Sequence, residues 1–294
     1  MAEVLSKGKL FDPQLVTDLI SKVQGKSSIA TLAQNKPVAF NGQKEFTFTM
    51  DSEIDIVAEN GKKGHGGISI DPVTIVPIKV EYGARISDEF LYASEESKLD
   101  VLKAFNDGYA KKLARGLDLM AIHGINPRSG TDSAVIGDNC VAKKVTQFVD
   151  FVEADPDTCI ETAVGLVQGS GGAVTGLAMA PTMATALAKL KVNGVKQFPE
   201  LSWGANPGTV NGLKADVNPT IASGKTYRAI VGDFANMFRW GYAKNIPLEI
   251  IKYGDPDGSG KDLKNYNQIY LRSETYLGWG ILVPEHFAVV KATS

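Results

Sequence analysis

The sequence predicts a mixed α+β fold in which helices and strands do not alternate regularly. Three observations support this class. Residues 44–58 and 73–86 alternate apolar and polar side chains with the period of a strand, and residues 88–123 carry apolar side chains at helical spacing. The remainder mixes short helices and strands without regular βαβ repeats, so a doubly wound nucleotide-binding fold is not expected.

Composition excludes several classes of protein. The 294 residues include 44% hydrophobic and 22% charged side chains, enough for a sizeable core, and the formal net charge of -2 argues against a dedicated nucleic-acid-binding protein. No apolar run spans a bilayer, and the first residues lack a signal peptide, so we expect synthesis in the cytoplasm and no membrane contact. Cys140 and Cys159 have no metal-site spacing and are predicted to be buried thiols in a reducing compartment.

Residues 12–25 predict the first helix. Asp12 can cap it, Pro13 suits its first position and Gly25 suits its end. Its apolar stripe consists of Leu15, Val16, Leu19, Ile20 and Val23. Such a helix packs either on its own domain or on a neighbouring subunit, and Leu15, Leu19 and Val23 are the candidates for the second alternative.

The two strand patterns predict a long β-hairpin with the sequence ENGKKGHGGISI (59–70) at its tip. From Ile78 the second pattern is strict, and Pro77 should mark a bulge or an edge. Two strands of this length would extend roughly 35–40 Å. Because a two-stranded ribbon is marginally stable in water, this hairpin must lie on another surface.

The segment 88–123 predicts a helix of about 40–50 Å, which the turn-forming residues 124–130 end. Further elements are predicted downstream: helices at 156–168 and from Pro181 to Gly194, a loop at 169–172, a strand at GLAMA, strands at 226–231, 236–240, 246–253, 268–277 and 281–291, and a turn-rich stretch at 254–262.

Neither glycine-rich motif has the spacing of a ligand-binding site. GKKGHGG lacks the GxxxxGK[ST] frame and precedes a strand rather than a helix, so a flexible hairpin tip is favoured over a phosphate loop. GSGG (169–172) is predicted to be an ordinary loop, and its Ser170 lacks the GxSxG frame. Residues 255–266 imitate a calcium loop, but the twelfth position is Tyr266 instead of glutamate, which favours a plain turn.

No other set of residues predicts a catalytic or metal-binding site. The histidines lie far apart without metal-ligand spacing: His65, His123 and His286. The tryptophans are expected in the core or at interfaces: Trp203, Trp240 and Trp279. No pair of carboxylates suggests an acid and a base. We therefore expect no catalytic residue, no cofactor and no metal, and the protein is predicted not to be an enzyme.

The order of the parts carries a resemblance to a known family. Residues 56–90 look like an extended loop that returns into a peripheral domain, and 117–130 look like the end of a long helix. Residues 177–198 look like a strand–proline–helix passage, and 210–221, 231–250 and 268–291 look like later strands. Together they resemble the major capsid protein of tailed bacteriophages, with the Hong Kong 97-type shell fold.

The resemblance implies a structural protein that forms rings of five and six copies and closes into an icosahedral shell around double-stranded DNA, without sequence-specific binding. It implies a virion protein assembled in the cytoplasm of a bacterial host. It also assigns the domains: an N-terminal arm (1–25), a peripheral domain (26–43, 78–135 and 251–277), an extended loop (44–77) and an axial domain (140–250 and 278–294). The long helix corresponds to the spine helix of the family.

Partners follow from the same resemblance. Copies of the chain itself come first; portal and decoration proteins are further candidates, and the absence of a long leader before the arm suggests a separate scaffolding protein or none. At the hairpin tip, Lys62, Lys63 and His65 become candidates for contacts with an adjacent subunit. Some family members crosslink a loop lysine to a distant asparagine.

The resemblance places Lys62 or Lys63 at the lysine position, and Asn265 or Asn267 lies near the asparagine position. Ser273, beside Glu274, stands where the helping glutamate is expected, so crosslinking is not predicted. Two alternatives stay open beside the viral shell. One is an encapsulin-like cellular nanocompartment; the other is a soluble enzyme with a glycine-rich ligand loop.

Overall fold

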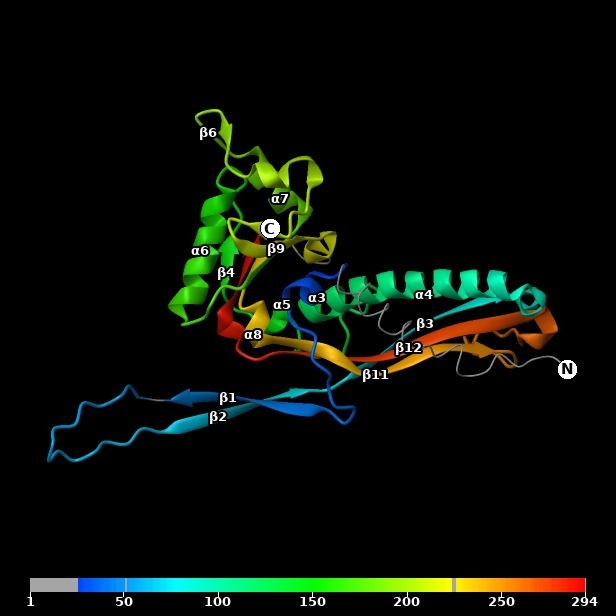
Figure 1. Cartoon of the computed structure of the whole chain (residues 1–294), viewed down its shortest axis with the longest axis horizontal. Coiled ribbons are helices and arrows are strands. Elements are labelled where there is room, and N and C mark those ends of the chain that lie inside the picture. Colours follow the sequence, from blue (N-terminus) through cyan, green and yellow to red (C-terminus); the bar gives the residue numbers. More distant parts are fainter. Residues whose placement is uncertain (1–25, 51, 224–225, 294) are drawn as a thin grey trace.

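The computed structural model describes residues 26–50, 52–223 and 226–293, and it contains three clearly separate parts (Figure 1). A two-stranded hairpin projects away from the rest of the chain. A long helix lies along a three-stranded sheet, and a compact lobe is built around a six-stranded sheet. The predicted helix at 12–25, with Leu15, Leu19 and Val23, lies outside the described residues.

The helices have the following bounds: α3 Ser28–Leu32, α4 Glu95–Asp118, α5 Val141–Lys144, α6 Pro156–Gly169, α7 Pro181–Lys189 and α8 Phe234–Met237. The strands are β1 Gln43–Met50, β2 Ile68–Ile75, β3 Ile78–Ser87, β4 Phe148–Asp150, β5 Gly176–Met179, β6 Lys191–Val192, β7 Val195–Lys196, β8 Thr209–Val210, β9 Leu213–Val217, β10 Tyr227–Gly232, β11 Phe238–Ile251, β12 Gln268–Ile281 and β13 Phe287–Lys291. Short 3-10 helices include η3 Pro199–Gly204 and η4 Pro219–Ala222.

The lobe is a sheet with the strand order β4-β13-β10-β5-β9-β8. One face is covered by α6 and α7, whose apolar side chains form a core with the small and branched residues of the central strands. The other face packs against α3, α5 and the end of α4 in a second core that contains Trp240 and Trp279. Successive residues of a strand point to opposite faces, so the same strands serve both cores.

The second sheet has the order β11-β12-β3, and α4 lies along it (Figure 1). Tyr109 of α4 and Thr275 of β12 share a hydrogen bond of 2.7 Å in this contact. The carboxyl-terminal half of α4 is the buried half, because Leu113 and Leu117 are covered whereas Leu99 is exposed. The carboxyl-terminal half of the helix is therefore buried, whereas the other half packs more loosely on the sheet, where Phe105 lies beside Tyr82 of β3.

Several predicted boundaries are wrong. The strand at 44–58 ends at Met50, because the opposing residues 61–67 are rich in glycine and provide no partner strand. The pattern at 73–86 contains two strands, which separate around Pro77 as expected of a residue without an N–H donor. The first of them pairs with β1 and the second with β12.

The helix predicted at 88–123 consists of a 3-10 turn, the helix α4 and a π-helical turn at Leu119–His123 that ends at Gly124 in the left-handed region. Ser94 caps α4 by accepting a hydrogen bond from the Ser97 N–H. At 1.5 Å per residue, α4 itself is about 36 Å long, somewhat shorter than predicted.

Further along the chain, α7 ends at Lys189 rather than at Gly194, which instead turns between β6 and β7 with φ of 81°. The strands expected at 236–240 and 246–253 form the single strand β11, which contains two irregularities in its pairing with β12. The last strand begins only at Phe287, since a 3-10 turn occupies Pro284–His286. Among the described residues, no helix combines the length and apolarity required to cross a membrane.

Candidate assembly interface

The β1–β2 hairpin has one apolar face. In its register Phe46 lies opposite Pro72, Phe48 opposite Ile70, and Met50 opposite Ile68. Directly opposed residues share a face of the ribbon, so these six side chains form a continuous surface. The alternate positions on the other face include Glu45, Thr47 and Ser69.

This apolar face is uncovered in the single chain. Phe48 is 69% exposed and Met50 76% exposed, and Phe46, Ile68 and Ile70 are at least half exposed. Large exposed apolar patches of this kind mark interaction sites in soluble proteins. Burial of each such side chain would contribute about 1.5–3 kcal/mol, so the hairpin is suited to lie against a second surface.

The tip of the hairpin holds the sequence-predicted contacts. Lys62, Lys63 and His65 are all exposed there. A turn closes at Gly61, whose N–H donates to the Ala58 carbonyl at 2.8 Å, and a Cβ at Gly61 would crowd this backbone. A side chain at this position would therefore require the turn to open. The contacts with another subunit stay a prediction.

Two glycines of β12 anchor the base of the hairpin. The fully buried Ile75 at the end of β2 lies over Gly278 and Gly280. A Cβ at Gly280 would lie 2.8 Å from the Ile75 Cγ1, closer than real contacts allow. The absence of side chains at these positions therefore lets the hairpin sit directly on β12 and fixes its direction.

A buried carboxylate joins three distant segments at the other end of α4. Asp118 is fully buried and accepts hydrogen bonds from the backbone N–H groups of Ser28 and Ile29, at 3.0 and 3.1 Å, at the beginning of α3. It also accepts from the Ser27 hydroxyl and, at 2.6 Å, from the Thr220 hydroxyl. The point where residues 1–25 join the described chain is thereby held against the end of α4.

Two opposing effects determine the pKa of Asp118. Burial disfavours the carboxylate and is the larger effect, whereas the four donors favour it. The result is a pKa raised to about 6. Sequence reasoning missed this residue, because its partners Ser27 and Thr220 are 91 and 102 positions away.

The loop that resembles a calcium site, residues 255–266, is held by ion pairs between side chains of the protein. Arg85 of β3 pairs with both Asp255 and Asp257, and Asp255 also accepts from the N–H groups of Ser259 and Gly260. A guanidinium thus takes the place between the carboxylates that a metal ion would need. The segment forms turns, and no cluster of three or more His, Cys, Asp and Glu side chains suited to a metal ion occurs among the described residues.

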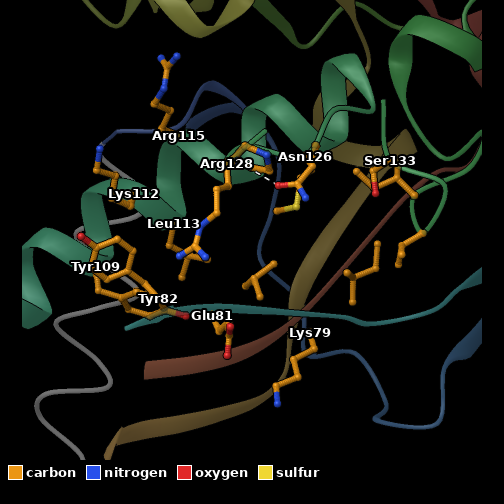
Figure 2. Close-up of a pocket in the computed structure, with 17 residues that line it drawn as sticks. Lys79, Glu81, Tyr82, Tyr109, Lys112, Leu113, Arg115, Asn126, Arg128 and Ser133 are labelled. Carbon is orange, nitrogen blue, oxygen red and sulfur yellow. Dashed lines mark hydrogen bonds between the residues drawn. The ribbon is translucent and has the colours of Figure 1, made fainter. Parts of the chain in front are cut away.

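A pocket of about 570 Å³ lies between α4, β3 and the loop 126–136 (Figure 2). Tyr82, Tyr109 and Arg128 line it, while Arg115 and Lys79 point away from its centre in this view. Neither glycine-rich motif, 59–70 or 169–172, contributes to its wall. The enzyme alternative, which required one of those loops at a ligand site, gains no support from this pocket.

The remaining predicted residues are dispersed. His123 is buried, with its Nε2 2.8 Å from the Thr220 carbonyl oxygen, and Cys140 and Cys159 are buried free thiols as predicted. Trp240 and Trp279 lie in the core, whereas Trp203 is fully exposed. Ser273 is buried in β12, and the absence of a crosslink stays a prediction.

The comparisons with known proteins agree with this geometry. The model of the phage capsid family matches residues 7–292. A structure from Mycobacterium phage Ogopogo is similar with a TM-score of 0.78 and 35% identity, over 91% of this chain and 92% of that chain. One from Gordonia phage Cozz has a TM-score of 0.77 and 25% identity, over 92% and 87%. Among curated proteins, no sequence matches.

A third structure shares the fold alone: the capsid of an empty GTA particle, with a TM-score of 0.64 and 16% identity over 91% of this chain and 90% of that chain. The Hong Kong 97-type fold expected from the sequence is thus confirmed, and the protein is a shell-forming major capsid protein of a virion. The match over almost the entire length shows that this chain belongs to the phage capsid family.

Proposed function

We propose that this chain assembles into rings of five and six copies, which close into an icosahedral shell around double-stranded DNA in the cytoplasm of a bacterial host. The observation that carries the proposal is the exposed apolar face of the β1–β2 hairpin. A projecting ribbon with half of its side chains apolar is stable only when another surface covers it. A neighbouring copy supplies that surface at every position of a shell.

The domain assignment is part of this proposal. The arm is residues 1–25, the extended loop 44–77, the peripheral domain 26–43, 78–135 and 251–277, and the axial domain 140–250 and 278–294. In support, all of the β1–β2 hairpin except Gln43 falls within the loop, and the six-stranded sheet falls within the axial domain. The role of the chain is structural rather than enzymatic, with a scaffolding, portal or decoration protein as further partners.

Electron microscopy and sedimentation of the purified full chain test the proposal. We expect closed particles of megadalton mass; small oligomers alone under all assembly conditions would refute it. Particles with cellular cargo in place of DNA would favour the nanocompartment alternative. Release of DNA from particles isolated from an infected host identifies the viral shell.

A matched pair of variants tests the hairpin face. Phe48→Lys places a charge on the apolar face, and Thr47→Lys places the same charge one residue away on the opposite face. We expect Phe48→Lys to lower particle yield at least tenfold and to leave the soluble chain folded, since Phe48 is exposed. Thr47→Lys should retain most of the yield. Equal yields from the two variants would contradict the role of the face.

A further inference from the structure

The two edges of the six-stranded sheet carry surfaces of different character. Strand β4 is at one edge and β8 at the other, so about 24 Å separate them at roughly 4.8 Å per strand. On the face that α6 and α7 cover, α6 lies over β4, β13 and β10. The turn η3 lies beyond α7, where its Leu201 packs with Val210 of β8. The two sides of the lobe are therefore formed by different segments.

The side formed by β4, the following loop and the first half of α6 is acidic. Residues 148–161 contain five carboxylates and no lysine or arginine. Asp150, Glu153, Asp155 and Glu161 are exposed. Two cations from other strands lie beside this segment, Lys291 over the Phe148 ring and Arg228 over the Phe151 ring, and they leave an excess of negative charge.

The chain that leads from α7 to the opposite edge strand β8 and on to β9 is basic. Residues 189–214, which form the end of α7, β6–β7, η3 and β8–β9, contain four exposed lysines and a single glutamate. Lys196 lies beside η3, because its Nζ donates to the Ser202 hydroxyl at 2.9 Å, and Lys214 lies on β9 opposite Thr209 of β8. We name residues 148–161 the acidic side and residues 189–214 the basic side.

Trp203 stands out on the basic side. Its side chain is 102% exposed, and its backbone has φ of 63°, in the left-handed region that bulky residues avoid. A fully exposed aromatic side chain buries no apolar surface within its own chain, and the backbone conformation that presents it is an unfavourable one. Tryptophan is also among the residues that most often anchor protein interfaces. The exposure of Trp203 therefore favours a contact with another protein surface.

We propose that the acidic side of one copy packs against the basic side of the next copy within a ring, with Trp203 as the apolar anchor between them. The inference rests on the proposed ring assembly. A ring of five or six copies needs two different complementary surfaces on each copy, and these two sides meet that requirement in charge and in position. On the acidic side, the 52%-exposed Val152 offers an apolar contact for the indole ring.

Charge reversals test the pairing. Lys196→Glu with Lys214→Glu makes both sides acidic, and Glu153→Lys with Glu161→Lys makes both sides basic. Each double variant should lower particle yield at least tenfold, whereas a chain with all four changes should recover to within about twofold of wild type. All four positions are exposed, so circular dichroism and the melting temperature of the unassembled chain should change little.

Co-assembly provides a sharper result. When the two double variants are mixed, copies must alternate around a ring, and alternation closes with six copies but not with five. We expect sheets or tubes of six-membered rings without closed shells. The pairing would be overturned if either double variant alone gave a normal particle yield, or if the quadruple variant formed no particles under conditions in which wild type does. A wild type that forms none refutes the underlying assembly proposal instead.

Trp203→Gly tests whether the indole ring contributes to assembly without contributing to the stability of the single chain. Glycine accepts the left-handed conformation, so the unassembled variant should melt at or above the wild-type temperature. Loss of the indole should nevertheless lower particle yield at least tenfold. An unchanged yield would remove Trp203 from the interface.

Discussion

Asp118 makes the free energy of unfolding depend on pH in an unusual direction. Most structural carboxylates have lowered pKa values, and their proteins lose stability on acidification. The pKa of Asp118 is raised from 3.8 to about 6, since burial outweighs the four donors. The folded state then binds the proton more tightly than the unfolded state, so this residue stabilises the protein below pH 4 and loses that contribution as pH rises to about 6.

The magnitude follows from the shift. One pKa unit corresponds to about 1.4 kcal/mol, so the raised pKa of Asp118 amounts to about 3 kcal/mol in total, of which about 2 kcal/mol fall between pH 4 and pH 7. Asp118→Asn removes the ionisation and keeps one acceptor oxygen. The free energy of unfolding of wild type, relative to this variant, should therefore decrease by about 2 kcal/mol from pH 4 to pH 7.

Urea unfolding of the unassembled full chain across this pH range measures the difference. The control is Asp138→Asn, because the Asp138 side chain is 89% exposed and its replacement should produce a difference within about 0.5 kcal/mol at every pH. A wild-type advantage that instead grows as pH rises would refute the reasoning. It would mean that the hydrogen bonds from Ser27, Ser28, Ile29 and Thr220 outweigh burial.

Two other changes test the hairpin. Gly280→Val places a side chain against Ile75, so the base of the hairpin should loosen, and limited proteolysis should cut the unassembled chain faster at residues 76–77, between β2 and β3. Gly108→Ala in α4, where a Cβ meets nothing within 4 Å, should instead stabilise the chain by about 0.5–1 kcal/mol. Deletion of residues 61–67 should leave the unassembled chain folded and impair shell closure, whereas unchanged particle yield and heat resistance would contradict the role of the tip.

Local patterns predicted the parts of this fold that depend on local interactions. The helical spacing of apolar side chains within 88–123, which includes Leu113 and Leu117, indicated α4, and the alternation before Met50 indicated β1. The ends of these elements depend on partners elsewhere. The strand stops at Met50 because the opposing residues 61–67 form no strand, and the alternation of Ile54 and Ile56 does not reveal this.

The candidate interface could be predicted only in part. The length of the hairpin indicated that it needs a covering surface, and the contacts of its tip residues Lys62 and Lys63 with another copy stay a prediction. The continuous apolar face was missed, although Phe46, Phe48, Ile68 and Ile70 become neighbours once the register is known. Trp203 could not be distinguished from the buried tryptophans, because its exposure results from the backbone conformation of η3.

The pairing of β3 with β12 has a consequence for synthesis of the chain. About 180 residues separate the end of β3 from the start of β12, so at roughly 5–20 residues per second the ribosome needs about 10–40 s to supply the missing partner. Until then the base of the hairpin has no β12 to rest on. The direction of the hairpin is therefore set only after β12 has been synthesised.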